Sequence, residues 1–320
     1  MTLSTIPLQP SVVWAILATY NGKQWIRRCL ESLRQNGISN IVIVDNASVD
    51  ETPKIVSKEF PDAILIENST NLGFGKANNL GIQKALNNGA THVLLVNQDI
   101  VFQQDTVNLL LSVMEKDSGF GLVSAFQLTY EGNSIDAAFR TYMPPSFTDD
   151  LYFSRKKQLY ETDYMPAAAV LMSREALLSV GGFDPLFFLY GEDDDLCSRL
   201  RKAGWKIGVV PAATVQHWHS FLHKKRDMKW RRNFTFTRGI KWLKNNPHSL
   251  FIAYLTLART WFADVDPLEI CARIPAFLKC IAKIATVHAH RARRPYTFSD
   301  PSHCNELPCA SALYPQKELR

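Results

Sequence analysis

Long apolar runs are missing from this 320-residue sequence. A membrane-spanning helix needs about 20 consecutive apolar residues, and no window of the sequence reaches that length. The N-terminal segment, MTLSTIPLQPSVVW, also lacks the basic start and the apolar middle of a signal peptide. These two absences predict a cytoplasmic protein.

Cysteine is scarce and dispersed. A disulfide framework or a zinc site would bring cysteines together at short, characteristic spacings. No C-x-x-C pair occurs here, so we expect free thiols in a reducing compartment. The six cysteines are Cys29, Cys197, Cys271, Cys280, Cys304 and Cys309.

The glycine-rich loops of common nucleotide-binding folds are also missing. No G-x-x-x-x-G-K-S/T sequence occurs, which argues against a P-loop enzyme. Residues 73–78 begin like the dinucleotide motif G-x-G-x-x-G, but Asn78 stands where the third glycine belongs. This segment also follows the third predicted strand instead of the first, which disfavours a dinucleotide-dependent oxidoreductase.

Charge is distributed unevenly along the chain. The whole sequence carries a net charge of +6, but residues 221–320 hold 18 Lys and Arg against 7 Asp and Glu. This basic end favours an anionic partner such as phospholipid headgroups or a lipid diphosphate. Nucleic acid is disfavoured because no RNP-type or helix-turn-helix signature accompanies the charge.

Aromatic and apolar residues are interleaved with the basic ones in this last part of the chain. Two interpretations remain open: ordinary helices packed on the main domain, or a membrane-facing surface with aromatic anchors and basic rims. The residues concerned are Phe234, Phe236, Trp242, Phe251, Tyr254, Leu257, Trp261 and Phe262.

Short apolar runs rich in β-branched residues alternate with amphipathic segments in the first hundred residues. Each run ends in a turn signal, and after the first run apolar residues recur at helical spacing. Four repetitions of this strand and turn pattern predict a parallel, doubly wound sheet. The expected strands are residues 12–18, 41–44, 63–66 and 93–96.

The second half of the chain is less regular. Residues 127–165 combine two prolines with mixed charge and are expected to be irregular. A further strand is predicted over residues 167–172, followed by a helix. A second helix closes at Gly204, and a strand follows over residues 207–210. The last hundred residues have a helical pattern that becomes rich in turns toward the end.

Polar residues stand directly after three of the predicted strands. They are Tyr20-Asn21, Asp45-Asn46 and Asn97-Gln98-Asp99. In open α/β sheets, ligands bind outside the carboxyl ends of the strands. The three loops therefore predict one shared binding site.

Several of these residues have both a chemical and a structural interpretation. Asn97 and Asp99 lie on one face after a buried strand, where their oxygens suit a hard divalent cation on phosphate groups, although Asp99 could instead cap a loop. Asp45 can accept a hydrogen bond from a nucleobase or a ribose hydroxyl, or it can cap a turn. His217 and His219 follow the last strand; one of them is a candidate metal ligand, or both are ordinary core or surface histidines.

Four carboxylates in a row, Glu192 to Asp195, follow an aromatic stretch. Neighbouring like charges repel, and a helix N-terminus offsets part of this repulsion, so a capping cluster is one interpretation. The other is a general base next to apolar walls that raise its pKa toward neutrality.

Taken together, these motifs resemble the family 2 glycosyltransferases of the GT-A fold, especially the bacterial rhamnosyltransferase-like branch. The resemblance covers roughly residues 12–220 and depends on the joint order and spacing of the motifs. They are ATYN at 18–21, VDNASVD at 44–50, NLGFG at 71–75, NQD at 97–99, GGFD at 181–184, YGEDDDLC at 190–197 with Arg199-Leu200, and His217.

The resemblance implies an α/β protein with a single Rossmann-like, doubly wound mixed sheet. It implies a GT-A glycosyltransferase domain over residues 1–220 and a basic, mainly helical extension over residues 221–320.

The resemblance also implies roles for individual residues. Asn97-Gln98-Asp99 takes the place of the D-x-D metal motif, so Asp99, together with His217, would hold Mg²⁺ or Mn²⁺ on the sugar diphosphate. Asn97 replaces the first aspartate of that motif, which leaves one carboxylate in it. Asp45 would bind the nucleotide base. The residues expected to bind the nucleotide sugar are Thr19, Tyr20, Asn21, Asp45, Asn71, Asn78, Asn97 and Gln98.

The implied reaction is metal-dependent glycosyl transfer with inversion, in which Asp193 takes the proton from the acceptor hydroxyl. Glu192 would orient Asp193 or the acceptor, while Asp194 and Asp195 would serve the start of the helix. The expected donor is dTDP-rhamnose, with UDP-hexoses or GDP-sugars as alternatives. The expected acceptor is a growing surface polysaccharide or O-antigen on a lipid carrier, reached from the inner face of the cell membrane.

Two other functions compete with this one. A nucleotidyltransferase would also need strand-end carboxylates and a metal, but it normally has a glycine-rich basic loop that Thr19-Tyr20-Asn21-Gly22 does not resemble. A non-catalytic nucleotide-sugar-binding subunit would lack the base or the metal residue, and both Asp193 and Asp99 are present.

Overall fold

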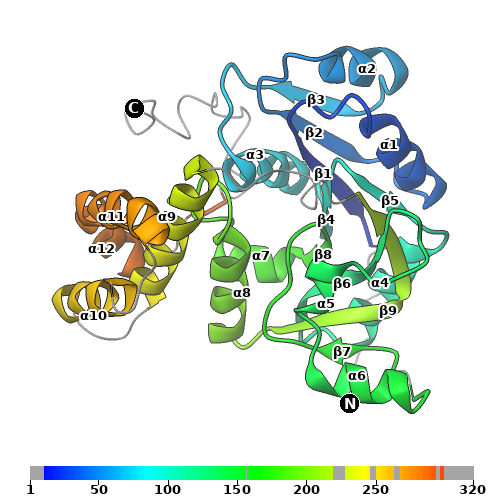
Figure 1. Ribbon diagram of the computed structural model, residues 1–320. Helices are drawn as coiled ribbons and strands as arrows, with labels where there is room; N and C mark the ends of the chain where they lie inside the picture. The colour runs from blue at the N-terminus through cyan, green and yellow to red at the C-terminus, as the bar shows by residue number, and fades with distance from the viewer. Residues whose placement is uncertain are drawn as a thin grey trace, which may run out of the picture.

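The computed structural model describes residues 11–155, 157–218, 228–245, 250–262, 267–292 and 296–298. Within these ranges the chain forms one mixed sheet covered by helices on both faces, followed by a group of C-terminal helices (Figure 1).

The sheet confirms the predicted doubly wound arrangement. Its strand order is β3-β2-β1-β4-β8-β6-β9-β5, with β7 paired to β9. The first four strands of this order are parallel, while β8 runs antiparallel to both of its neighbours. The strands are β1 (Val13–Thr19), β2 (Ile41–Asp45), β3 (Ile64–Glu67), β4 (His92–Asn97), β5 (Ile100–Phe102), β6 (Phe120–Thr129), β7 (Tyr160–Glu161), β8 (Ala169–Ser173) and β9 (Lys206–His217).

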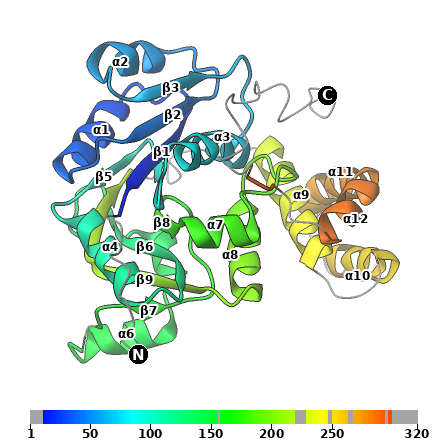
Figure 2. The same ribbon diagram turned by 180° about the vertical axis from the view of Figure 1, so that it is seen from behind.

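Alternating strand side chains feed two separate cores, one on each face of the sheet. Ile16 packs with the core beneath α3, α7 and α8, whereas its neighbour Leu17 packs with the core beneath α1, α2 and α4 (Figures 1 and 2). The helices around the sheet are α1 (Ile26–Gln35), α2 (Thr52–Glu59), α3 (Phe74–Asn87), α4 (Thr106–Lys116), α5 (Ala137–Arg140), α6 (Pro145–Tyr152), α7 (Arg174–Val180) and α8 (Glu192–Lys202).

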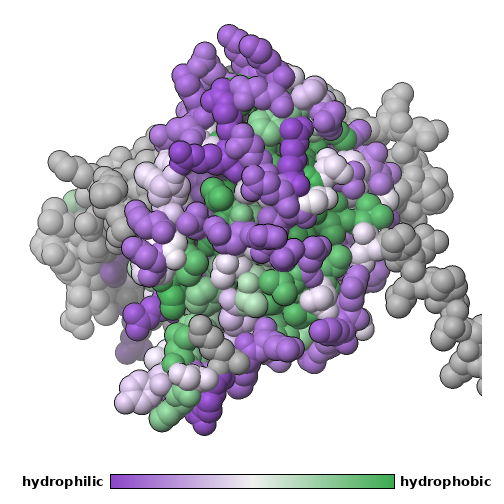
Figure 3. Space-filling model, turned by 90° about the vertical axis from the view of Figure 1, so that its right-hand side faces the viewer, coloured by the Kyte–Doolittle hydropathy of each residue, from purple (hydrophilic) through white to green (hydrophobic). Residues whose placement is uncertain are grey.

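Helix α1 shows how the local pattern produces this packing. Its apolar side chains recur every three or four residues, and Ile26, Leu30 and Leu33 are fully buried against the sheet. Arg27 and Arg28 lie between them on the solvent side. Figure 3 shows the resulting hydrophilic surface in the upper part of the molecule, where Figure 1 places α1 and α2.

The C-terminal helices form a third apolar cluster beyond α8. They are α9 (Met228–Asn245), α10 (Leu250–Phe262), α11 (Pro267–Ala282) and α12 (Ile284–Ala292). Leu243, Leu257 and Cys280 lie at the centre of this cluster, and Phe187 joins it from the loop before α8. In the described part of the chain, no helix is both long and apolar enough to cross a membrane.

The aromatic residues of these helices pack inward. Tyr254 is 8% exposed, and Phe236, Trp242 and Trp261 are partly buried against the same cluster. These four side chains hold the helices together, and the membrane-facing surface stays a prediction. The side chains of Phe234, Phe251 and Phe262 lie outside the described residues.

The sequence pattern did not predict the elements that lack a strong local period. The segment 127–165, expected to be irregular, contains α5, α6 and β7, which are two short helices and a two-residue strand. Strand β9 runs for 12 residues instead of the four predicted, because it continues past an irregularity opposite Ala125 and Phe126 of β6.

Gly73 occupies a backbone conformation that only glycine adopts readily. Its φ is 85° and its ψ is 174°, and a Cβ there would lie 2.2 Å from the carbonyl oxygen of Phe188. This close approach joins the loop before α3 to the loop before α8. Gly37 has a similar φ of 77°, but no described atom lies within 4 Å of the corresponding Cβ position.

We expect Gly73→Ala to lower the free energy of unfolding by roughly 2–4 kcal/mol, since backbone strain and overpacking add. The matched control, Gly37→Ala, carries the strain alone and should cost about 1 kcal/mol. Urea denaturation of the two variants measures both values. Equal losses would contradict tight packing of the two loops.

Candidate active site

The ends of β1 and β2 are joined by a carboxylate. Asp45 is 2% exposed. Its Oδ1 atom accepts hydrogen bonds from Thr19 Oγ1 at 2.9 Å and Ser48 Oγ at 2.6 Å, and its Oδ2 accepts one from the Ser48 amide at 2.8 Å. Asp45 therefore shapes the loop after β2, and its predicted contact with the nucleotide base stays a prediction.

The loops after β1, β2 and β4 are held together by side-chain amides. Gln98 Oε1 accepts a hydrogen bond from the Tyr20 amide at 3.0 Å, and Gln98 Nε2 donates to the Tyr20 carbonyl at 3.2 Å. Asn21 Oδ1 accepts from the Val49 amide at 2.9 Å. Tyr20, Asn21 and Gln98 thus lie side by side, as their shared position after parallel strands predicts.

The segment before α3 is attached to the loop after β2 and to the loop before α8. Asn71 Oδ1 accepts a hydrogen bond from the Gly73 amide at 2.9 Å, and the Phe74 amide donates to the Phe188 carbonyl at 3.1 Å. Asn78 is placed differently from the other predicted residues. It is 1% exposed, and its side-chain amide donates to the Phe74 carbonyl within α3.

Asp99 and His217 form the second polar centre of the site. Asp99 Oδ1 lies 3.5 Å from His217 Nε2, and the Asp99 side chain is 23% exposed. His217 Nδ1 lies 2.9 Å from Gln127 Oε1, so Gln127 orients the imidazole with Nε2 on the side of Asp99. His219, the other histidine considered, lies outside the described residues.

The acidic run forms the first turn of α8. Glu192 is 3% exposed. Among the described residues, Glu192 Oε2 and Asp193 Oδ1 are buried without a hydrogen-bond partner. The amide of Ala167 donates to the Asp193 carboxylate. An unsatisfied buried carboxylate oxygen is costly and commonly marks a place where a ligand binds.

Burial dominates the titration of this turn. It raises the pKa of Glu192 to about 7 and holds the pKa of Asp193 well above its ordinary range. The charges of Glu192 and Asp194 raise the pKa of Asp193 further, and the Ala167 amide opposes them. These shifts suit a general base that works near neutral pH.

A short path of contacts joins this base to the metal side of the site. Asp193 is bonded to the Ala167 amide, and the adjacent Ala168 carbonyl accepts a hydrogen bond from the Asn97 amide at 2.8 Å. Asn97 is two residues before Asp99. The predicted base on α8 is therefore linked through residues 167 and 168 to the end of β4, next to the predicted metal ligand.

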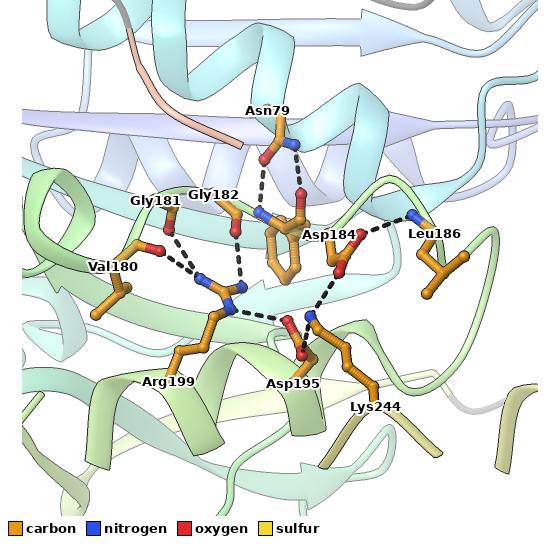
Figure 4. A network of polar contacts seen from close by, with 10 residues as sticks. Asn79, Val180, Gly181, Gly182, Asp184, Leu186, Asp195, Arg199 and Lys244 are labelled. Atoms are coloured by element: carbon orange, nitrogen blue, oxygen red, sulfur yellow. Dashed lines mark hydrogen bonds and ion pairs between the residues drawn. The ribbon is translucent and has the colours of Figure 1, made fainter. Parts of the chain in front are cut away.

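Asp194 and Asp195 do more than serve the start of the helix. Asp195 Oδ2 accepts a hydrogen bond from Arg199 Nε at 2.8 Å, and its other oxygen pairs with Lys244 of α9 (Figure 4). Asp194 forms an ion pair with Lys241, also of α9. Their partners in the C-terminal helices could not be read from the local sequence.

Three further residues belong to the site. Gln127 holds His217, while Tyr142 and Tyr164 lie close enough to the acidic turn for Asp193 and Asp194 to influence them; burial raises the pKa of both phenols. Gln127 and Ser124 are the polar residues in the buried run of β6, and a polar residue there is a signal that could have identified Gln127. The tyrosines carried no such signal.

Solved structures define the class of fold. The chain superposes on GalNAc-T7 with UDP, GalNAc and Mn²⁺ with a TM-score of 0.60 at 16% identity, covering 87% of this chain and 58% of that one. It superposes on Staphylococcus aureus TarS 1-349 with a TM-score of 0.55 at 15% identity, covering 87% and 82%. A third match is the Pyrobaculum calidifontis mannosyltransferase PcManGT, with GDP-Man and Mn²⁺, with a TM-score of 0.52 at 18% identity, covering 88% and 84%. The chain thus has the GT-A glycosyltransferase fold.

The sequence gives the family. Residues 14–178, more than half of the chain, match the family "Glycosyl transferase family 2". The protein therefore belongs to glycosyl transferase family 2. A second description, "N-terminal domain of galactosyltransferase", matches residues 154–224.

Curated relatives carry related names. An N-acetylglucosaminyl-diphospho-decaprenol L-rhamnosyltransferase of Mycobacterium tuberculosis is 26% identical over 64% of this chain and 76% of its own length. The rhamnosyltransferase WbbL of Escherichia coli K12 is 24% identical over 70% of this chain and 91% of its own length.

The raised pKa values predict how transfer depends on pH. A base acts in its ionised form, so kcat/KM should fall as pH drops through the raised pKa values of the Glu192 and Asp193 pair, far above the value of about 4 for an exposed aspartate. Glu192→Gln removes a like charge and should move this acid limb to lower pH. A limb that stays in place in the variant would show that Glu192 does not act on the base.

Proposed function

We propose that this protein is an inverting transferase that moves a sugar from a nucleoside diphosphate to an acceptor hydroxyl, with Asp193 as the general base. The observation that carries the proposal is the buried, unsatisfied Oδ1 of Asp193. Asp193 is linked through residues 167 and 168 to the end of β4 near Asp99 and His217, in a chain of glycosyl transferase family 2.

Asp193 has the properties that proton removal requires. The Ala167 amide donates to its carboxylate, and burial raises its pKa, which strengthens it as a proton acceptor. The acceptor hydroxyl would donate to Oδ1 and lose its proton there as its oxygen attacks the anomeric carbon. The C–O bond to the diphosphate breaks as the new glycosidic bond forms on the opposite face.

Asp99 and His217 fit a divalent cation. A carboxylate oxygen and an imidazole Nε2 face each other, and Gln127 orients the ring in the way that outer partners of metal-binding histidines do. No cluster of three or more suitable side chains occurs in the described ranges, so water and the diphosphate would complete the shell. When bound, Mg²⁺ or Mn²⁺ would neutralise charge on the leaving diphosphate.

The donor is proposed to be dTDP-rhamnose. The support comes from the curated relatives, several of which are named as rhamnosyltransferases. Thr19, Asp45 and the loop of Tyr20 and Asn21 would hold the nucleoside, and Asn71 would lie near the sugar and phosphates. The acceptor is proposed to be a growing surface glycan on a lipid carrier, as the name of the M. tuberculosis relative indicates for that protein.

A ligand screen tests the donor and the cation together. Bound ligand stabilises a protein by RT ln(1 + [L]/Kd), so the melting temperature ranks dTDP, UDP and GDP directly. We expect dTDP with Mn²⁺ to give the largest shift. Asp99→Asn should abolish the part of the shift that depends on Mn²⁺, while Asp62→Asn, an exposed surface carboxylate, should leave it unchanged.

A transfer assay with the matching nucleotide sugars completes the test. Asp193→Asn should keep the ligand-induced shift and lose about 10²–10⁴-fold in kcat. Wild-type turnover in this variant would remove Asp193 from the mechanism. Release of pyrophosphate from a nucleoside triphosphate, with a sugar phosphate as the second substrate, would instead identify a nucleotidyltransferase. Binding without any turnover by the wild-type protein would identify a non-catalytic subunit.

We further propose that the C-terminal helices lie on an anionic membrane surface. The side chains that carry this proposal are aliphatic, not aromatic. Ile274, Leu278 and Ile281 recur at helical spacing on α11 and are 46%, 60% and 44% exposed; on α10, Ile252 and Leu255 are 49% and 56% exposed. Exposed apolar faces beside basic residues favour the interface of anionic lipids.

Vesicle flotation tests this surface. The protein should bind vesicles that contain anionic phospholipid, bind weakly to neutral phosphatidylcholine vesicles, and lose binding as salt rises. The double variant Leu255→Glu and Leu278→Glu should lose most of this binding without a change in fold. Tyr152→Glu, at a residue that is 82% exposed outside these helices, is the matched control. Unchanged binding by the double variant would overturn the proposal.

A further inference from the structure

Helix α9 packs directly on the loop that leads into the acidic turn. Thr237 Oγ1 donates to the Leu189 carbonyl at 3.5 Å, and a Cβ on Gly191 would lie 2.7 Å from the Thr237 methyl group. Tyr190, between these two positions, has a φ of 69°, an uncommon conformation for a residue with a side chain. The loop is therefore shaped by contact with a helix outside the sheet.

Lys244 of α9 reaches into a buried polar network. Its side chain is 6% exposed and forms ion pairs with both Asp184, which is 0% exposed, and Asp195, which is 1% exposed. Arg199 donates to Asp195 and also to the carbonyls of Val180 and Gly182, each at 2.7 Å (Figure 4). Lys244 and Arg199 thus balance the charges of the buried carboxylates of Asp184 and Asp195.

The same network reaches the donor side of the site. Asn79 of α3 accepts a hydrogen bond from the Phe183 amide and donates to the Phe183 carbonyl, both at 2.8 Å (Figure 4). Asp184, the next residue, accepts from the Leu186 amide at 2.9 Å and pairs with Lys244. Helices α3, α8 and α9 are therefore linked through one set of buried contacts.

Lys241 of α9 lies one turn before Lys244 and pairs with Asp194 at the surface. The two side chains are 40% and 30% exposed. Asp194 is the immediate neighbour of Asp193. Lys241 therefore places a positive charge on the one flanking carboxylate that is not already paired by Lys244 or buried with the base.

We propose that Lys241 and Lys244 are positioning residues for the base, through which the C-terminal helix holds the first turn of α8 and balances the charges beside Asp193. This inference depends on the proposed role of Asp193. Lys244 fixes the helix by pairing two carboxylates that would otherwise be buried without enough counter-charge. Lys241 limits the negative field that Asp194 exerts on Asp193.

Other groups also face the base and influence its titration. On its own helix these are Glu192, Asp194 and the buried thiol of Cys197. From the segments packed against it they are Tyr142 and Tyr164, whose phenols both respond to the charges of the acidic turn. Neither tyrosine is altered in the variants below.

Lys241 gives the sharper experiment because the pair is partly exposed and its loss should not unfold the protein. Lys241→Gln frees the charge of Asp194, so the acid limb of kcat should move to higher pH by roughly 0.3–0.7 unit at low salt. In an Asp194→Asn background the same substitution should have no effect. Lys206→Gln, which breaks the surface pair with Asp117 at the start of β9, should leave the limb in place.

Two substitutions of Lys244 test its positioning role, one that removes the charge and one that keeps the charge but changes the shape of the side chain. Lys244→Met should lower kcat at least tenfold with the KM for the donor little changed, and Lys244→Arg should restore part of the loss. If Lys244→Met fails to fold, the double variant Lys244→Met and Asp184→Asn removes one charge of each sign and allows the same kinetic comparison.

The outcomes separate this inference from the function on which it depends. If Asp193→Asn keeps wild-type turnover, the base assignment fails first. If Asp193→Asn loses turnover, yet Lys241→Gln leaves the acid limb in place and the Lys244 variants keep wild-type kcat, the base stands and the positioning role of α9 is overturned. A parallel loss of donor binding and kcat in a folded Lys244→Met variant would likewise overturn it, since a positioning residue for the base should lower kcat without weakening donor binding.

Discussion

Helix α8 begins with four consecutive carboxylates and is nevertheless packed against the interior of the protein. Removing an ionised carboxylate from water costs several kcal/mol unless partners replace the solvent. Each of the four is compensated differently. Asp195 is fully paired by Arg199 and Lys244, and Asp194 has Lys241. Among the described residues, the Ala167 amide donates to Asp193 and backbone amides donate to Glu192. The counter-charge around α8 is therefore distributed unequally over the four carboxylates.

That inequality has consequences for both chemistry and stability. The two carboxylates without a cation are the ones whose pKa values are raised by burial, which makes them proton acceptors near neutral pH. A carboxyl group with a raised pKa in the folded state binds its proton more tightly there than in the unfolded chain. Its contribution to stability is therefore lost as pH rises from the unfolded pKa through the folded one. The base thus exists at some cost in stability at neutral pH, and the paired residues beside it limit that cost.

Local patterns were enough to predict the parallel half of the sheet and the composition of its edge. The β-branched runs of β1 to β4 and the polar residues after them follow from burial and from period, which act over a few residues. Strand β6, the short helices α5 and α6, and the partners of Asp194 and Asp195 depend on contacts between distant parts of the chain. Lys241 and Lys244 look like ordinary surface lysines in the sequence. Only the packing of α9 on α8 gives them a different role, and no period or spacing encodes that contact.

The amide side chains of the motifs show why a motif residue can be recognised without its function being known. Beyond the ends of β1, β2 and β4 the backbone ladder stops, and each loop still needs partners for its N–H and C=O groups. Gln98 supplies both for Tyr20, and Asn79 supplies both for Phe183. Asn46 accepts from the Leu72 amide and donates to the Gly73 carbonyl. An amide offers a donor and an acceptor a short distance apart, as a peptide group does. These residues extend the order of the sheet into its loops, so the rigidity of the site arises from side chains that need never touch a ligand.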